Sequence, residues 1–184
     1  MISIGTGGLF TWYSYIAPLM TTVAGFSENS VTYILMLAGM GMMVGNFFGG
    51  YLADRFSPAK ATGVLLLAMV LTLIIVHYLS FHPALALIMT FITGVVSFSL
   101  AAPIQMLMIN SAKGSEMIAA SVSQASFNIG NALGAFFGGL PLVYGYDYTS
   151  PAAVGAAMAF FGALFAFWLI LKNASLKRYP VLET

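Results

Sequence analysis

Six long apolar segments separated by short connections constrain the fold of this chain most. They lie near 3–26, 31–52, 61–79, 84–109, 118–143 and 151–171, and each has about the 20 residues with which an α-helix crosses a bilayer. Apolar residues make up 60% of the chain, charged residues only 6%, and the mean hydropathy is +0.97. The segments lack the polar and apolar alternation of a membrane β-barrel. We therefore expect an all-α, polytopic membrane protein: one six-helix transmembrane bundle over 1–184, with a tail at 172–184.

The same composition argues against several other classes of protein. The net charge of +1 gives no broad basic field, so nucleic acid is not an expected partner. Cysteine is absent and the two histidines, His77 and His82, are too few for a metal cage. No nucleophile and base pair is visible either. We expect no enzyme activity, no catalytic residue, no metal and no cofactor, and the lipid bilayer as a partner.

The basic residues predict an orientation. All of them fall after even-numbered segments, at Arg55, Lys60, Lys113, Lys172, Lys177 and Arg178. Cytoplasmic connections of membrane proteins are enriched in Lys and Arg. The pattern therefore places these connections and both termini in the cytoplasm, with the protein in the bacterial inner membrane.

Two glycine-rich stretches resemble each other. GMMVGNFFGG over 41–50 and GNALGAFFGG over 130–139 agree at six of ten positions. Each places glycines four residues apart, which on a helix form a bare ridge for close packing; the ridges are Gly41, Gly45, Gly49 and Gly130, Gly134, Gly138. Because the copies lie three segments apart, they predict two inverted three-helix units. Independent origin of two glycine zippers is the alternative.

A short motif at the end of the second segment resembles a known family signature. GYLADR over 50–55 is similar to the first part of G-x-L-A-D-R/K-x-G-R/K-R/K, which is typical of the major facilitator superfamily. The second part departs, with Ser57 in the place of glycine and Pro58 and Ala59 in the place of bases. This weaker form is typical of the second half of such transporters. PIQM over 103–106 and ASFNIGNALGA over 125–135 resemble the drug:proton antiporter branch that includes sugar and arabinose exporters.

The resemblance implies a function. It predicts the C-terminal half of a secondary transporter that exports a sugar or drug by alternating access and proton antiport, with a missing N-terminal six-span half and a small-molecule substrate as partners. No Asp, Glu, Lys or Arg lies in mid-segment, which fits a family whose proton-carrying acids generally lie in the N-terminal half. In the resembling proteins the loop signature latches the two halves together, a role that would fall to Gly50, Asp54 and Arg55. A solvated flank that only fixes topology is the alternative for Asp54.

Five side chains are candidates for substrate binding. Gln105 follows Pro103, whose missing N–H breaks a helix in mid-segment, and broken membrane helices tend to line cavities. Gln124 and Asn128 share one helix face with Ser121 and Asn131, which indicates either a cavity or interhelical hydrogen bonds. Trp12 and Tyr15 share a face of the first segment, and an ordinary packed cluster is the alternative for them. Leu66 is expected to face lipid.

A non-transporting membrane scaffold is the competing function. Such a protein would use the two glycine ridges to bind a partner protein. We also expect that six helices cannot cover both ridges if the second and fifth segments border another half, so that one ridge stays open in the isolated chain.

Overall fold

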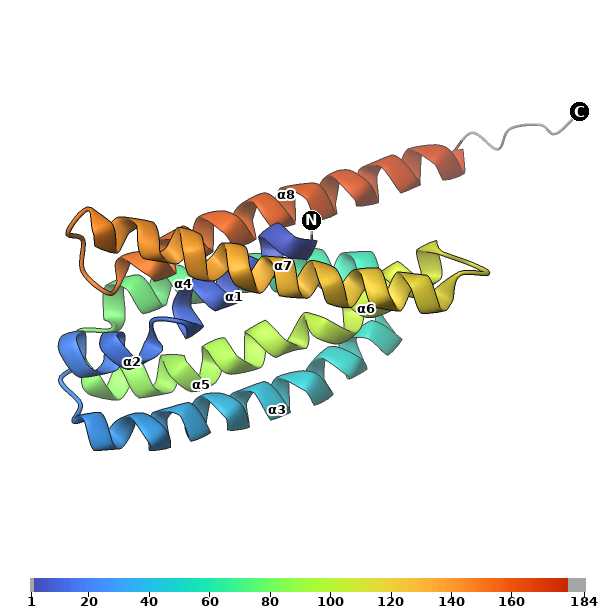
Figure 1. Ribbon diagram of the computed structural model, residues 1–184. Coiled ribbons are helices and arrows are strands. Elements are labelled where there is room, and N and C mark those ends of the chain that lie inside the picture. Colours follow the sequence, from blue (N-terminus) through green and yellow to red (C-terminus); the bar gives the residue numbers. More distant parts are fainter. Residues whose placement is uncertain (1, 179–184) are drawn as a thin grey trace, which may run out of the picture.

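The computed structural model describes residues 2–178, with side chains for 2–172. Throughout this part of the chain the regular structure is helical (Figure 1). The longer helices are α1 (Ile2–Tyr13), α3 (Val31–Arg55), α4 (Pro58–Leu79), α5 (Pro83–Ser99), α6 (Ala101–Ser111), α7 (Glu116–Val143) and α8 (Ser150–Arg178). Short turns complete the connections: α2 (Ile16–Pro18), the π-helical η1 (Leu19–Val23) and the 3₁₀ turn η2 (Glu28–Ser30). The predicted all-α class is confirmed.

Within the described residues, four helical stretches are long and apolar enough to cross a bilayer. They are Glu28–Arg55, Pro58–Leu79, Pro83–Ser111 and Ser150–Lys172. The chain is therefore a multi-pass membrane protein. The stretch over 2–23 is divided between three short helices, and α7 carries the polar side chains that the sequence places on one face. The predicted tail begins inside α8, which continues to Arg178; residues 179–184 lie outside the described part.

Two of the predicted segments are each divided, at a point four residues before a proline. α1 ends at Tyr13, next to Ser14, and Pro18 follows four residues after Ser14. α5 ends at Ser99, and Pro103 follows four residues later. A proline ring collides with the carbonyl group four residues before it and has no N–H to donate to that group. The segments 3–26 and 84–109 are therefore not continuous helices.

The glycine ridge of α3 packs against α5. All three glycines are buried, and a Cβ atom added to them would meet, in turn, the backbone carbonyl groups of Phe91, Val95 and Ser99. The hydroxyl of Ser99 donates a hydrogen bond of 3.1 Å across this contact to the Gly45 carbonyl oxygen. The two backbones approach so closely because no side chain stands between them.

The second ridge packs in the same way against α1. A Cβ atom on Gly134 would meet the carbonyl group of Gly7, and one on Gly138 would lie 3.0 Å from the Cα atom of Thr11. The second and fifth predicted segments thus pack against the fourth and first. The expectation that one ridge stays uncovered is wrong, because both ridges face helices of this chain and other faces of α3 and α7 are exposed.

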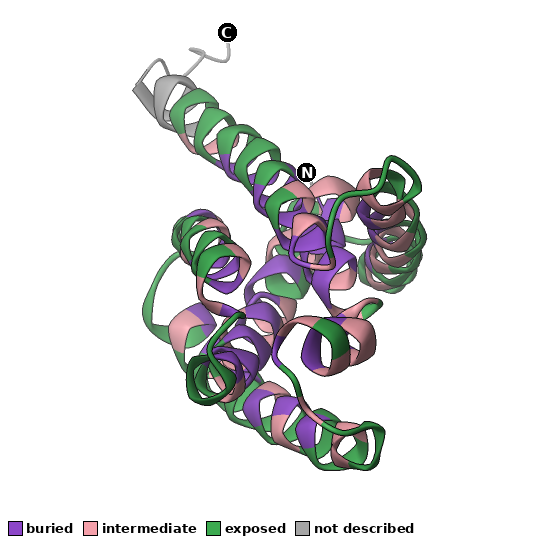
Figure 2. Cartoon of the chain, turned by 90° about the vertical axis from the view of Figure 1, so that its left-hand side faces the viewer, coloured by how far each residue is buried: buried purple, intermediate pink, exposed green. Residues whose placement is uncertain are grey.

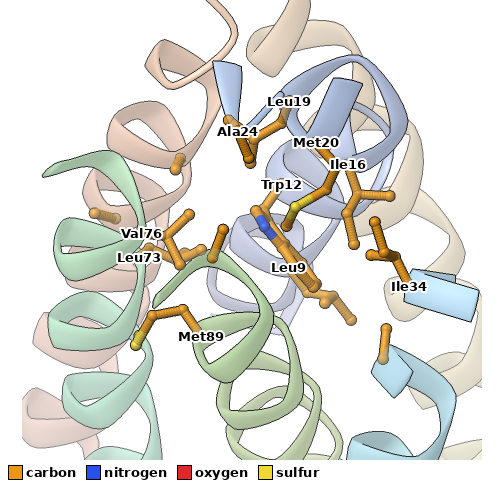
Figure 3. Packing of buried hydrophobic residues seen from close by; sticks show 14 of the residues in the cluster. Leu9, Trp12, Ile16, Leu19, Met20, Ala24, Ile34, Leu73, Val76 and Met89 are labelled. Carbon is orange, nitrogen blue, oxygen red and sulfur yellow. The ribbon is translucent and has the colours of Figure 1, made fainter. Parts of the chain in front are cut away.

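The main core lies around Trp12, near the end of α1. Figure 3 shows its indole ring among Leu9, Ile16, Met20 and other apolar side chains from α1, α2, η1, α4 and α5. Trp12 is only 1% exposed. Figure 2 shows the buried faces turned toward the middle of the bundle, with exposed faces around it. Many exposed side chains are large and apolar, as expected for helices that meet lipid.

The connections that carry Lys and Arg lie at one end of the bundle. In Figure 1 the α3–α4 turn, the α6–α7 loop and the C-terminal end of α8 lie at the right. The connections without Lys or Arg, near 24–30, 80–82 and 144–149, lie at the left. The structure therefore separates the basic end of the molecule from an end that carries only Glu28, His77, His82 and Asp147 as ionisable groups other than tyrosine.

Candidate functional site

A cavity of about 230 Å³ lies between α1, α4, α5, α6 and α7. Both broken segments contribute to it, and it lies beside the point where α5 gives way to α6. Its lining consists of Thr6, Leu9, Phe10, Met69, Ser97, Phe98, Leu100, Ala101, Gln105, Gln124, Phe127 and Asn131. The cavity thus brings together two of the predicted binding residues, Gln105 from α6 and Gln124 from α7.

The polar groups of this lining are uncharged. Gln105 and Gln124 each offer an amide with donor and acceptor atoms. The Oδ1 atom of Asn131 is buried and, within the described chain, has no hydrogen-bond partner. Ser97 already donates to the Thr93 carbonyl oxygen, and Thr6 to that of Ile2. An unpaired buried acceptor costs free energy, so a ligand or a water molecule that donates a hydrogen bond to the Asn131 Oδ1 atom would be bound favourably.

Most of the remaining wall is apolar and aromatic. Phe10, Phe98 and Phe127 come from three different helices and present rings to the cavity, with Leu9 and Met69 beside them. A pocket with apolar walls and a few polar groups is typical of small-molecule sites. This lining suits an uncharged molecule that has both a hydrophobic surface and hydrogen-bonding groups.

The other predicted binding residues lie elsewhere. Trp12 belongs to the core cluster and does not line the cavity; its Nε1 atom has no partner within the described chain. Tyr15 donates a hydrogen bond of 2.9 Å from its hydroxyl to the Ala135 carbonyl oxygen, which joins the break after α1 to α7. Asn128 is exposed and outside the cavity lining. Leu66, expected to face lipid, is 1% exposed and lies in a second core cluster.

The sequence interpretation missed several members of the lining. Thr6 and Phe10 are four residues apart and share a face of α1, and Phe127 shares a face of α7 with Gln124 and Asn131. Phe127 and Asn131 follow Gln124 by three and seven positions, so a search of the sequence for residues on the same helix face as Gln124 would have included Phe127. Nothing in the sequence distinguishes Thr6 from the other threonines of the chain, because its role depends on which helix packs beside it.

The loop-signature residues lie at the basic end of α3. Asp54 and Arg55 are exposed in the last turn of the helix, which ends at Arg55. A Cβ atom on Gly50 would meet nothing within 4 Å. In this chain the glycine is therefore not required for packing, unlike Gly49 beside it.

A polar cluster joins helices at the other end. The Nδ1 atom of His77 lies 3.0 Å from the Thr149 carbonyl oxygen, so α4 is tied to the turn that precedes α8. Asp147 accepts hydrogen bonds from the hydroxyl and the backbone N–H of Thr149. The Thr149 hydroxyl in particular, with the nearby His77, holds the pKa of Asp147 below its ordinary value. Asp147 is therefore an anion at neutral pH.

Comparison with known proteins identifies similar sequences. A family model described as Major Facilitator Superfamily matches residues 1–182. "Putative transporter AraJ" of Escherichia coli K12 is 38% identical over 156 residues, which are 85% of this chain and 40% of that protein. "Inner membrane transport protein YdhP" of the same organism is 35% identical over 89% of this chain and 42% of its own length.

A third relative is more distant. "Probable sugar efflux transporter" of Helicobacter pylori J99 is 29% identical over 88% of this chain and 40% of its own length. The chain thus spans about 40% of the length of these curated relatives. No solved structure matches the chain significantly.

Proposed function

The chain belongs to the major facilitator superfamily, a family of membrane transporters and not of enzymes, and we propose that it acts as the C-terminal six-span half of a secondary exporter. Its partner is an N-terminal six-span half, and the two halves together carry an uncharged small organic molecule by alternating access. The observation that carries this proposal is the cavity in which Gln105, Gln124 and Asn131 meet three phenylalanine rings.

The helix contacts support two inverted three-helix units. The glycine ridge of α3 packs on α5, and the equivalent ridge of α7 packs on α1. Each pairing thus joins the second helix of one unit to the first helix of the other. In both units that first helix is broken four residues before a proline. A two-fold axis in the membrane plane, which relates one unit to the other, would produce this pair of equivalent contacts. The contacts therefore support α7 and the stretch over 2–23 as spans in addition to the four long apolar helical stretches.

The separation of charge supports the orientation. Because basic connections stay in the cytoplasm, we place the ends of α3 and α6 and the C-terminus of α8 there, in the inner membrane, together with the N-terminus. Asp54 and Arg55 then lie at the cytoplasmic surface. We propose that Asp54, exposed at the negative end of the α3 dipole, latches onto a cation or a helix N-terminus of the partner half.

The coupling of transport to protons would have to come from the partner half. The cavity lining contains no ionisable side chain, and an intramembrane charge is the usual mark of a proton relay. The Helicobacter pylori relative is named as a probable sugar efflux transporter, so sugars are the first substrates to test. Apolar walls beside amide groups suit a sugar or a small drug, since both combine hydrophobic faces with hydrogen-bonding edges.

Cysteine accessibility tests the cavity. The chain contains no cysteine, so Gln105→Cys and Gln124→Cys can be compared directly with Leu71→Cys, a position that is 62% exposed on α4. In inner-membrane vesicles that also contain the N-terminal half of AraJ, we expect a charged thiol reagent to modify the two cavity positions at least about tenfold faster, because thiolates form only where water reaches. A bound sugar or drug should slow both reactions. Equal rates at all three positions would favour the scaffold function.

A further inference from the structure

Two apolar grooves lie on either side of α8 near its beginning. The groove between α4 and α8 has a volume of about 550 Å³, and the groove between α7 and α8 about 510 Å³. Their walls are almost wholly aliphatic and aromatic, with Val70, Ile74, Ala153, Ala156 and Phe160 in the first and Phe137, Leu140, Val154, Met158 and Phe161 in the second. Neither groove belongs to the cavity described above.

The two grooves meet at one small residue. Ala157 lines both of them and is exposed, so only a methyl group stands between them on the surface of α8. One turn further along the helix, Phe160 lies in the first groove and Phe161 in the second, with ring centroids 6.2 Å apart. At this place the surface of α8 therefore forms only a low ridge between the two grooves, and each groove contains one phenylalanine side chain.

Both grooves open toward the same end of the bundle, where polar side chains gather. Tyr78 and His77 stand at the first groove, and Tyr144 and Tyr146 at the second. The three tyrosines are 69%, 80% and 68% exposed, respectively. Tyrosine rings commonly occupy the headgroup level of a bilayer, where their hydroxyls can donate to phosphate oxygens. The loop over 144–149 joins α7 to α8 at this end of the bundle (Figure 1).

The charge of this loop is negative. Asp147 is its one ionised side chain at neutral pH, and it is exposed. The Lys and Arg residues of the described chain lie at the opposite end of the bundle. An anionic headgroup would meet no Lys or Arg side chain here and only the imidazole of His77, which lies at the first groove. A primary ammonium could pair with the Asp147 carboxylate and lie over a tyrosine ring.

We propose that α8 carries a binding site for one diacyl phospholipid with a primary ammonium headgroup, of the phosphatidylethanolamine type. One acyl chain lies in each groove, on either side of Ala157, and the ammonium group pairs with Asp147. The proposal rests on the transmembrane arrangement described under the proposed function, but it requires no substrate and no transport.

The headgroup, and not the apolar walls, sets the selectivity of this site. Every lipid offers the same hydrocarbon to the grooves, so apolar contact gives no preference for one lipid over another. An exposed ion pair contributes about 0.2–1 kcal/mol, which corresponds to a preference of about 1.4- to fivefold. Phosphatidylcholine can occupy the grooves equally well, but its quaternary ammonium cannot donate a hydrogen bond to Asp147.

Tryptophan quenching by brominated lipids measures this preference. In a Trp168→Phe background, Phe160→Trp reports the first groove, while Ile92→Trp on α5 serves as a control at a similar distance from the same end of the bundle. Trp12, which is 1% exposed, remains in both variants, and its signal is measured in the Trp168→Phe parent and subtracted. The purified chain is placed in phosphatidylcholine bilayers that contain a small fraction of a lipid brominated in its acyl chains. Phosphatidylethanolamine, phosphatidylcholine and phosphatidylglycerol carry the bromines in turn.

We expect brominated phosphatidylethanolamine to be enriched about 1.4- to fivefold at Phe160→Trp and not at Ile92→Trp. Asp147→Asn, which retains an acceptor for Thr149, should abolish the enrichment. Ala157→Leu places a larger side chain between the two grooves and should therefore lower quenching by every lipid at residue 160. Equal quenching by all three lipids, or strongest quenching by phosphatidylglycerol, would overturn the proposal. A chain that passes this test but supports no transport when it is co-reconstituted with the N-terminal half of AraJ would count against the proposed function alone.

Discussion

Gly45 lies against Val95 with no room for a side chain between them: a Cβ atom at residue 45 would stand 3.0 Å from the Val95 carbonyl carbon and closer still to its oxygen. Gly134 has the same relation to the carbonyl group of Gly7. These residues occupy equivalent places in the two glycine-rich stretches. The repeat therefore preserves a contact between helix backbones as well as a composition, and this contact can be tested by adding one methyl group.

Gly45→Ala should destabilise the chain. Backbone atoms cannot move aside as a flexible side chain can, so α3 and α5 must separate, at a cost of about 1–3 kcal/mol. Gly39→Ala on the same helix is the matched control, because its Cβ atom would meet nothing within 4 Å; it should be neutral or stabilising by about 0.5–1 kcal/mol, since alanine favours the helix. Thermal unfolding in detergent measures both. Equal melting temperatures for the two variants would contradict the close contact.

Tyr15→Phe should weaken the junction between α7 and the break after α1. The substitution removes the hydrogen bond to Ala135, at a cost of about 0.5–1.5 kcal/mol. Gly139 makes room for this hydroxyl, because a Cβ atom there would collide with it. Unfolding by SDS in mixed micelles gives the free energy, with Tyr33→Phe as a control at a residue that is 72% exposed. If both phenylalanine variants unfold alike, the Tyr15 hydrogen bond contributes nothing.

The sequence predicted the all-α class, because long apolar segments bounded by charge leave few alternatives, but it did not predict that the segments 3–26 and 84–109 are divided. It also identified Gln105 and Gln124 as candidates for one cavity, from their polarity and from the position of Pro103. It did not predict that Trp12 is enclosed in the core or that Leu66 is buried. A helix that is apolar on all sides carries no periodic signal for which face meets protein and which meets lipid. For the same reason, the sequence did not show against which helix each glycine ridge packs.

Topology reporters test the six spans and their direction. Fusions after Pro58, Lys113 and Lys177 should report the cytoplasm, and fusions after Asn29, His82 and Asp147 the periplasm, because the basic connections stay inside. The fusions at Lys113 and Asp147 bracket α7, whose polar face makes it the least certain of the long helices to insert. The same compartment on both sides of any one helix would remove that span.

Asp147 should make the stability of the turn before α8 depend on pH. Its pKa is lowered chiefly by the Thr149 hydroxyl, so its stabilising effect is present above the unfolded pKa of about 3.9. That effect is lost as pH falls through the lower folded value. The difference in unfolding free energy between the wild type and Asp147→Asn should be on the order of 0.5 kcal/mol at pH 7, because the group is largely solvated, and should shrink toward pH 3. A difference that grows on acidification would contradict this assignment.

The last prediction is that the isolated 184-residue chain does not carry out gradient-driven transport. Its cavity is lined by uncharged side chains, so no group in that lining can take up a proton and couple its movement to that of a ligand. Alternating access also requires two bodies that move against each other around the site, and this chain spans about 40% of the length of AraJ.

Proteoliposomes that contain the chain alone should therefore show no sugar uptake when a proton gradient is imposed. Co-reconstitution with the N-terminal six spans of AraJ should restore uptake, and Asp54→Asn should lower that uptake while leaving the amount of inserted protein unchanged, because it removes the latch and not the fold. Gradient-driven uptake by the chain alone would refute the half-transporter proposal. Full activity of Asp54→Asn would refute only the latch, since the cavity does not depend on it.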